Sequence, residues 1–486
     1  MKRILERYPF FLFLLPLFVI IHFEKEFNVV IKHEFIYDRI IILFAVPILG
    51  FLFFYIFFRS VLKSSLMTFG FLLVFYYTGD LRNWLTQILP DSIWQRYTLI
   101  LPVLFSILVM LFFWLKKNKS SLQRHCFYIN IAFLLFILSD AVQLFLTHRQ
   151  YKNKIYPVTE IENSVCHNCT RPDIFYIIFD AYASSKQLQS EFGYSNYQIE
   201  EDLKKKGFRI IKDSKSNYNY TAFSLASTFN MSYIKNIDTN HTIQSRLYFQ
   251  CVKLVHNNVI FSFFQKENYQ IFNLSFFDVK SFPGIIQHAD VWDMKKLIDQ
   301  YNLFFKMYRD LHHFPVRVND LFATKFLWNV PEKRNDIDLI VYNHVLRAAH
   351  LESSHPKFVY AHFMRPHPSY HFDSLGRRFR NDTISNREAY IHQIAYSNRM
   401  IKNMTDSIMA YTKRPLVIII QGDHGDKNTQ EKQRAFSNFN AIYFSDNNYS
   451  LLNDSITNVN TFRIVLNTFF RKDLALLPNK SYFIYQ

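Results

Sequence analysis

The sequence predicts a chain in two parts: an N-terminal bundle of about five transmembrane helices, and an extracytoplasmic α/β domain with a mainly parallel sheet. Long apolar runs crowd the first 150 or so residues and then stop. Beyond about residue 170, short β-rich runs alternate with helical stretches, which is typical of a parallel sheet covered by helices. We therefore expect a transmembrane domain at 1–147, a linker at 148–171 and a second domain at 172–486.

Composition excludes two broad classes of protein. Half of the 486 residues are hydrophobic and 18% are aromatic, which is too apolar for a disordered chain. The mean hydropathy is −0.04, so the chain is not embedded in a membrane along its whole length. A mixture of membrane and soluble parts fits both values.

Five apolar runs are predicted to cross the membrane. A crossing needs about 20 apolar residues, with a range down to about 17, and the first and third runs are shorter. The first run lacks a small-residue cleavage site and is followed by further runs, so we interpret it as an anchor and not as a signal peptide. The runs are Tyr8–Phe23, Ile40–Phe58, Leu66–Gly79, Tyr97–Leu115 and Phe127–Leu146.

Positive charge predicts the orientation of the bundle. Lysine and arginine collect before the first run, between the second and third, and between the fourth and fifth. The N-terminus is therefore expected in the cytoplasm, and five crossings place the second domain on the outer side of the membrane. A domain outside the cytoplasm does not meet nucleic acid, so the net charge of +17 indicates lipid head groups or anionic envelope polymers as partners.

The chain has four cysteines. Cys166 and Cys169 form a C-x-x-C motif, and a single pair does not match a four-ligand zinc site. On the outer side of a membrane we expect a local disulfide; the alternative is two free thiols. Cys126 lies at the start of the last apolar run, and Cys251 lies alone in the second domain.

Six strands are predicted in the second domain. Several are continuous apolar runs, as in a sheet that is buried on both faces. Helical stretches lie between them, for example Ile337–Leu351 and Arg387–Ala410, and in such sheets the functional site lies beyond the carboxyl ends of the strands. The strands are expected at Ile174–Phe179, Phe208–Ile211, Tyr269–Leu274, Phe358–Phe363, Leu416–Ile420 and Ala441–Phe444.

Candidate metal ligands follow two of these strands. Asp180 follows the first strand, and Asp423 and His424 follow a later one, bracketed by Gly422 and Gly425 in a chain with only nine glycines. Glycine permits a tight turn and a close backbone approach. Carboxylates and imidazole suit Zn²⁺ or Mn²⁺. The alternatives are that Asp180 caps the next helix and that the later segment is an ordinary polar turn.

A candidate nucleophile, Thr221, is predicted to lie at the start of a helix. A hydroxyl in that position faces free backbone N–H groups and the positive end of the helix dipole, which favours an alkoxide and a bound phosphate. A neighbouring metal lowers the pKa of the hydroxyl further. The alternative is that Thr221 is a plain N-cap, and Ser224 is the second candidate nucleophile.

Three histidines and one arginine lie within ten residues at the end of another strand. His362, Arg365 and His367 are candidates to bind a phosphoryl oxygen, and the histidine or arginine side chains could also protonate a leaving group. Prolines on both sides of His367 fix its backbone. His362 is equally well explained as a core residue, and His371 is better explained as a surface residue.

Together these segments resemble the sulfatase-like branch of the alkaline phosphatase superfamily. The resemblance is greatest to membrane-anchored phosphoethanolamine transferases and lipoteichoic acid synthase-type phosphoglycerol transferases. Asp180 matches the acidic residue that follows their first strand, and Thr221 opens a stretch of their pattern T-A-x-S-x-x-x-x-F. Asp423-His424-Gly425 matches their late Asp-His-Gly motif.

The resemblance implies a metal centre and a substrate contact. It implies that His367 contacts the substrate phosphate. The C/S-x-P-S-R motif of sulfatases does not occur in the sequence, which argues against arylsulfatase chemistry. The implied ligands of one divalent metal, zinc or manganese, are Asp180, Thr221, Asp423 and His424.

The implied reaction is transfer of a phospho-head group, of phosphoethanolamine or phosphoglycerol type. A membrane phospholipid would be the donor, an envelope lipid or glycan the acceptor, and phosphothreonine at Thr221 the intermediate. His367 would act in catalysis and in substrate binding, together with His362 and Arg365. Two alternatives stay open: a membrane-anchored phosphodiesterase or sulfatase-like hydrolase, and a non-catalytic membrane scaffold that retains the fold.

Overall fold

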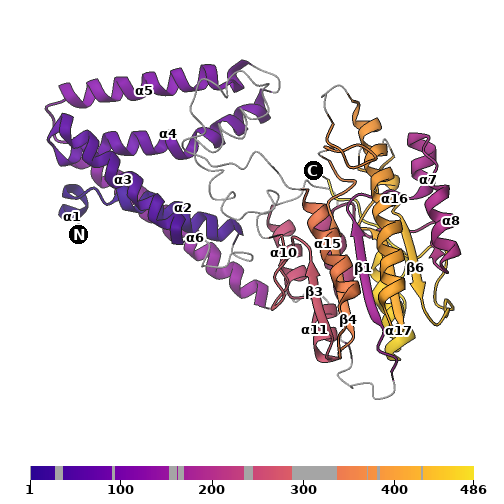
Figure 1. Cartoon of the computed structure of the whole chain (residues 1–486). Coiled ribbons are helices and arrows are strands. Elements are labelled where there is room, and N and C mark those ends of the chain that lie inside the picture. Colours follow the sequence, from indigo (N-terminus) through magenta and orange to yellow (C-terminus); the bar gives the residue numbers. More distant parts are fainter. Residues whose placement is uncertain are drawn as a thin grey trace. The chain divides into compact units, whose positions relative to one another are not determined.

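A computed structural model describes most of the chain, which divides into two compact units. The first unit holds the described residues up to 152, and the second holds those from 161 onward (Figure 1). The predicted domain boundaries stay predictions. The described residues are 2–27, 37–89, 93–152, 161, 169–234, 245–286, 336–368, 370–379, 384–427 and 431–485.

The first unit is built of helices (Figure 1). Within its described residues, three helices are long and apolar enough to cross a membrane, at Val61–Arg82, Tyr97–Lys117 and Gln123–Leu146. Two shorter apolar helices, Phe11–His22 and Leu43–Phe58, match the first two predicted runs. The helices are α1 (Lys2–Arg7), α2 (Phe11–Phe27), α3 (Tyr37–Phe58), α4 (Val61–Ile88), α5 (Tyr97–Lys117) and α6 (Gln123–Lys152).

The second unit is built on a six-stranded sheet with the order β2-β6-β5-β1-β4-β3. The central strand β1 (Asp173–Phe179) pairs in parallel with β4 (Lys357–Phe363) and with β5 (Leu416–Gly422). On the far side of β4, β3 (Gln270–Leu274) is also parallel. Every residue of β1, β4 and β5 is buried, as their continuous apolar sequences predict.

The other edge of the sheet is antiparallel. There β6 (Asn440–Phe444) pairs with β5, and the short β2 (Arg209–Ile210) pairs with β6. All six predicted strands are present, and the prediction of a mainly parallel sheet is confirmed. In the parallel register Phe179 lies opposite both Phe363 and Gly422. The residues that follow β1, β4 and β5 therefore meet at one edge of the sheet.

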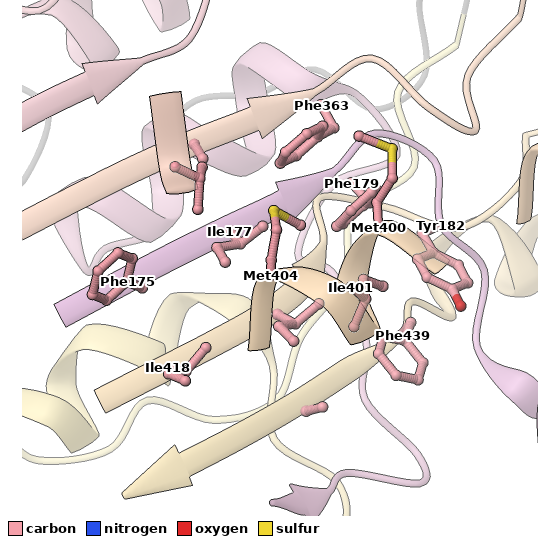
Figure 2. Packing of buried hydrophobic residues seen from close by; sticks show 14 of the residues in the cluster. Phe175, Ile177, Phe179, Tyr182, Phe363, Met400, Ile401, Met404, Ile418 and Phe439 are labelled. Carbon is pink, nitrogen blue, oxygen red and sulfur yellow. The ribbon is translucent and has the colours of Figure 1, made fainter. Parts of the chain in front are cut away.

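One face of the sheet is covered by α15 (Ile337–His350) and α16 (Asn386–Tyr411). Successive side chains of a strand point to opposite faces. Phe175, Ile177 and Phe179 of β1 accordingly belong to the hydrophobic cluster that includes the α16 residues Met400 and Met404 (Figure 2).

The opposite face carries an aromatic cluster. The Tyr176 ring contacts Phe229 of α9 (Thr221–Asn230) and Phe462 of α17 (Thr461–Phe470), with ring centroids 5.8 Å and 4.9 Å apart. This packing fixes α9 on the sheet. The remaining helices of the unit include α7 (Ser185–Gln187), α8 (Tyr197–Lys205), α10 (Ser245–His256) and α11 (Val259–Lys266).

The cysteines divide into bonded and free. Cys169 is disulfide-bonded, which agrees with the expectation for the C-x-x-C motif; Cys166 lies outside the described residues. Cys126 and Cys251 are free and buried.

Candidate metal centre and nucleophile

Asp180 lies directly after β1, at the edge where the parallel strands end. Its backbone N–H donates to the carbonyl of Phe363 at 3.0 Å. The next residue, Ala181, has a φ of 60°, a left-handed conformation that costs a residue with a side chain about 1–2 kcal/mol. The Ala181 N–H donates to the Asp423 carboxylate at 2.9 Å, and the Tyr390 hydroxyl donates to the Ala181 carbonyl at 2.8 Å. These two bonds stabilise the turn that carries Asp180.

Asp423 and His424 reach the same edge from β5. The Asp423 Oδ1 atom accepts hydrogen bonds from the N–H groups of Ala181 and His424, each at 2.9 Å. The Nδ1 atom of His424 lies 2.7 Å from the Gly425 carbonyl oxygen, so Nδ1 carries the proton and Nε2 presents a lone pair. Burial lowers the pKa of His424, which keeps the ring neutral, as a metal ligand must be.

The two glycines that bracket this pair are required by close packing. A Cβ atom at Gly422 would lie 2.5 Å from the carbonyl oxygen of Tyr182, and one at Gly425 would lie 2.6 Å from that of Ser437. Both contacts are with backbone, which cannot move aside as a flexible side chain does. The close backbone approach inferred from the sequence is therefore present.

Thr221 is the first residue of α9, and Tyr220 is the N-cap. The interpretation of Thr221 as a plain N-cap is therefore wrong. Its Oγ1 atom lies 3.3 Å from Asp180 Oδ2 and 3.4 Å from His424 Nε2. Ser224 instead donates its hydroxyl to the carbonyl of Asp423 at 2.6 Å. The geometry favours Thr221 over Ser224 as the nucleophile.

The four residues form a site that fits a divalent cation. Asp180, Asp423 and His424 offer ligand atoms that all lie within 4.8 Å of one another. Asp180 Oδ1 and Asp423 Oδ2 are buried and have no hydrogen-bond partner in the described part of the chain. Burying unpaired carboxylates costs several kcal/mol per charge, and a cation of charge +2 would offset both. Carboxylate oxygens with one imidazole suit zinc or manganese.

Two further histidines, His362 and His367, also influence the pKa of Asp180. His362 Nε2 lies 3.7 Å from Asp180 Oδ2, and the Tyr360 hydroxyl lies 2.9 Å from His362 Nδ1. Burial raises the pKa of Asp180, but His367, His362 and His424 together lower it below the ordinary range of a carboxyl group. His362 is thus both a buried strand residue and a neighbour of the cluster formed by Asp180, Asp423 and His424.

His367 and Arg365 both lie in the segment after β4, but their side chains have different surroundings. His367 is partly exposed and lies near enough to act electrostatically on Asp180. The buried Arg365 guanidinium instead pairs with Asp336 at 2.7 Å and Asp338 at 2.9 Å, and its Nε donates to Gln393 at 3.0 Å. The structure therefore does not bring Arg365 into the cluster; its guanidinium anchors the segment that carries His367.

Sequence reasoning missed two residues of the site. Tyr390 holds the Asp180 turn from α16, and no local pattern in the sequence signals that contact. Lys427 lies four residues after Asp423, with Nζ 4.2 Å from the centroid of the Tyr220 ring. Burial lowers the pKa of Lys427, while the carboxylates of Asp180, Asp423 and Asp426 raise it. Its position so close to the Asp-His-Gly motif is the feature of the sequence that could have identified Lys427 as a candidate.

The chain matches a known protein family. A family model described as Sulfatase matches residues 172–468, and no curated protein matches the sequence. The chain is similar to the integral membrane protein lipooligosaccharide phosphoethanolamine transferase A of Neisseria meningitidis, with 12% identity, 93% of this chain and 90% of that chain covered, and a TM-score of 0.41.

Two further solved structures are similar to the chain. One is the C-terminal periplasmic domain of EcEptC from Escherichia coli in complex with zinc, with 10% identity, 67% of this chain and 92% of that chain covered, and a TM-score of 0.40. The other is the phosphonate monoester hydrolase of Agrobacterium radiobacter, with 10% identity, 61% and 73% covered, and a TM-score of 0.36.

Proposed function

This chain is a membrane-anchored enzyme of the sulfatase family, and from that premise we propose that it transfers a phospho-head group from a phospholipid to an envelope lipid or glycan. The observation that carries the proposal is the Thr221 hydroxyl, which lies 3.3 Å from Asp180 and 3.4 Å from His424 at the start of a buried helix. A hydroxyl held among metal-ligand side chains is what a covalent transfer needs.

The reaction is proposed to depend on one divalent cation, zinc or manganese. A cation bound there supplies positive charge that favours the deprotonated form of the Thr221 hydroxyl and offsets the charge of phosphoryl oxygens. The residues proposed to hold it are Asp180, Thr221, Asp423 and His424.

In the first half of the reaction, the Oγ1 atom of Thr221 attacks the phosphorus of the donor in its deprotonated form. The bond between phosphorus and the lipid oxygen breaks, and His367 gives that oxygen a proton, which leaves diacylglycerol and a phosphothreonine. In the second half, His367 takes the proton of an acceptor hydroxyl, whose oxygen attacks the phosphorus. The bond to Thr221 then breaks, which returns Oγ1 to its deprotonated form. The first-turn N–H groups of α9 face the negative charge that develops.

A second candidate function is hydrolysis, with water in place of the acceptor hydroxyl. The match to a family model described as Sulfatase favours it. The two functions share the first half of the reaction and differ only in what attacks the phosphothreonine. Product analysis with and without a candidate acceptor distinguishes them, because only a transferase joins the head group to the acceptor.

We also propose that the protein lies in a bacterial inner membrane, with residues 172–486 on the periplasmic or extracellular side. The distribution of lysine and arginine between the apolar runs supports this orientation. Labelling of cysteines introduced at exposed positions, with a reagent that cannot cross the membrane, tests it. Labelling only after the membrane is opened would contradict it.

Mass spectrometry of the full-length protein incubated with phospholipid is the direct test of the proposed function. A phospho-adduct on Thr221 is expected, and its mass names the transferred group. Turnover without an adduct at Thr221, even when the reaction is quenched early, would contradict the proposed intermediate.

A further inference from the structure

Residues 474–485 follow α17 and form neither a helix nor a strand of the sheet. The backbone N–H and C=O groups of such a segment need partners outside regular structure. Three asparagine side chains provide them, because each amide donates to the carbonyl of one residue and accepts the N–H of that same residue. We name residues 474–485 the strap and each two-bond pair an amide clamp. The clamps join Asn467 to Leu474, Asn460 to Leu477 and Asn219 to Ile484, with distances of 2.8–3.0 Å.

Two of the clamps are local, and the third reaches the candidate nucleophile. Asn460 is the N-cap of α17 and Asn467 lies within that helix, which immediately precedes the strap. Asn219 instead lies two residues before Thr221 and 265 residues before Ile484. The family model matches residues 172–468, so the strap lies outside the matched region.

The strap also contacts the two residues before Asn219. The Tyr482 N–H donates to the Asn217 carbonyl at 2.9 Å, and the Tyr482 ring stacks on that of Tyr218, with ring centroids 5.8 Å apart. Asn217, Tyr218 and Asn219 are all buried. The strap therefore holds three consecutive residues of the segment that leads into α9.

The first turn of α9 depends on this segment. The side chain of Tyr220, the N-cap of α9, makes no capping hydrogen bond. Such a bond normally stabilises the first turn of a helix, so here the residues before the N-cap have that role. Asn219 is buried, and a buried amide without partners costs free energy. Its two bonds to Ile484 therefore favour one position of the backbone beside Thr221.

We propose that Asn219, through its clamp with Ile484, is a positioning residue that sets where the Thr221 hydroxyl lies. This inference rests on the proposed role of Thr221 as nucleophile and adds the contact that orients it. Displacing a reacting group by about 1 Å can slow a reaction by about a hundredfold. A nucleophile on the first residue of a helix, where packing of the helix body constrains it least, needs such support.

The chain offers a matched control, Asn467. Its amide makes the same two bonds to the same strap, at 2.8 Å and 2.9 Å, but it lies within α17 and not beside Thr221. Asn219→Ala and Asn467→Ala each remove one amide clamp, so both are expected to lower the thermal midpoint by similar amounts. A purely structural role of Asn219 predicts no other difference between the two variants.

The experiment measures turnover of a water-soluble phosphodiester by the full-length, metal-loaded protein, well below the midpoint of either variant. Asn219→Ala is expected to lower kcat by about tenfold or more and to leave KM nearly unchanged, because the nucleophile is displaced while the substrate contacts remain. Asn467→Ala is expected to keep kcat within about twofold of the wild type, as a change distant from the site does.

Hydrogen exchange followed by mass spectrometry gives a second readout, which needs no turnover. Asn219→Ala is expected to speed exchange of the backbone amides at 219–224, and Asn467→Ala only that of amides in α17 and the strap. Ile484→Pro removes the N–H on the other side of the clamp and should match Asn219→Ala. Combining the two changes should lower kcat no further, because both break the same pair of bonds.

Unchanged exchange at 219–224 in both Asn219→Ala and Ile484→Pro would overturn the inference. An equal loss of kcat in Asn219→Ala and Asn467→Ala would overturn it too, because the clamp would then act only on stability. Turnover by the wild type without an adduct on Thr221 would instead contradict only the proposed function, since neither readout depends on the intermediate.

Discussion

At the scale of single residues, each carboxylate of the candidate site has one oxygen that is hydrogen-bonded and one that has no partner among the described residues. Asp423 Oδ1 accepts two backbone N–H groups, while Oδ2 has no partner among the described residues. His424 likewise uses Nδ1 on a carbonyl and presents Nε2. The backbone therefore orients the side chains before any ion binds, which is how ligand geometry is normally set.

Thr221→Ala is expected to abolish turnover and the covalent adduct, because no other hydroxyl is placed between Asp180 and His424 in the described residues. Metal content should fall little, since two carboxylates and an imidazole remain. Ser224→Ala is the matched control: it removes a 2.6 Å bond to the Asp423 carbonyl and should cost about 1 kcal/mol of stability while keeping turnover. Full activity of Thr221→Ala would contradict the assignment.

The lowered pKa of His424 predicts acid sensitivity of the metal-free protein. Below the ordinary histidine pKa of 6.5, the His424 side chain takes up a proton in the unfolded chain but stays neutral in the folded protein. Stability is therefore lost as pH falls below about 6.5, by at most about 1.4 kcal/mol per pH unit for this group. The thermal midpoint of the wild type should drop more steeply between about pH 7 and pH 5 than that of His424→Asn. Parallel curves would contradict this origin.

At the scale of elements, the turn after β1 depends on a helix that is distant in sequence. The Tyr390 hydroxyl of α16 donates to the Ala181 carbonyl at 2.8 Å and accepts from the Ala183 N–H at 3.2 Å. Ala181 lies in the left-handed region, so the turn needs these bonds to persist. Through them, α16 positions Asp180.

Tyr390→Phe is expected to cost about 1–3 kcal/mol, because two buried backbone groups lose their partner. Metal affinity should fall by about tenfold, the effect of losing a group that orients a ligand. Calorimetric metal titration measures the affinity, and the thermal midpoint measures the stability. The control is Tyr411→Phe, on the same helix but 55% exposed, which should change neither. Loss of stability without loss of metal affinity would exclude a positioning role.

Elements were predictable from sequence where hydrophobic runs alone determine them. The strands at the carboxyl edge are such runs, and Asp180, Asp423 and His424 follow them directly. The third apolar run was predicted too short, because α4 begins before Leu66 and buries Ser64 and Ser65, which a hydropathy count treats as breaks. The Ser64 hydroxyl donates to the carbonyl of Ser60, one turn earlier, at 2.8 Å, so this serine stays helical.

The contacts of Arg365 and Tyr390 were not predictable in this way. Each depends on partners from other elements, and local sequence does not show which elements meet. The position of Arg365 near two histidines suggested a phosphate contact. Its guanidinium instead forms ion pairs with Asp336 and Asp338, which lie nearly thirty residues earlier in the chain. Short-range patterns therefore indicated Asp180, Asp423 and His424, which the structure brings together, while the residues that hold these side chains in place came only from the fold.

At the scale of the whole molecule, the chain joins apolar helices to a sulfatase-family enzyme domain. A lipid donor is confined to a bilayer, so an enzyme anchored in the same bilayer meets it at a high effective concentration. A soluble enzyme would have to extract each donor molecule from the membrane. The anchor therefore makes physical sense for a lipid substrate in particular.

The rate of turnover of a lipid donor is therefore expected to depend on whether the enzyme and the donor share a bilayer. Full-length protein reconstituted in vesicles should turn over a phospholipid donor in its own bilayer about a hundredfold faster, or more, than the same donor in separate vesicles. A water-soluble phosphodiester should be turned over equally in both arrangements, which controls for the state of the active site. Release of the head group is followed by mass spectrometry. Equal rates with donor in the same and in separate vesicles would mean that the helices do not present the lipid, because the enzyme would then reach its donor through water.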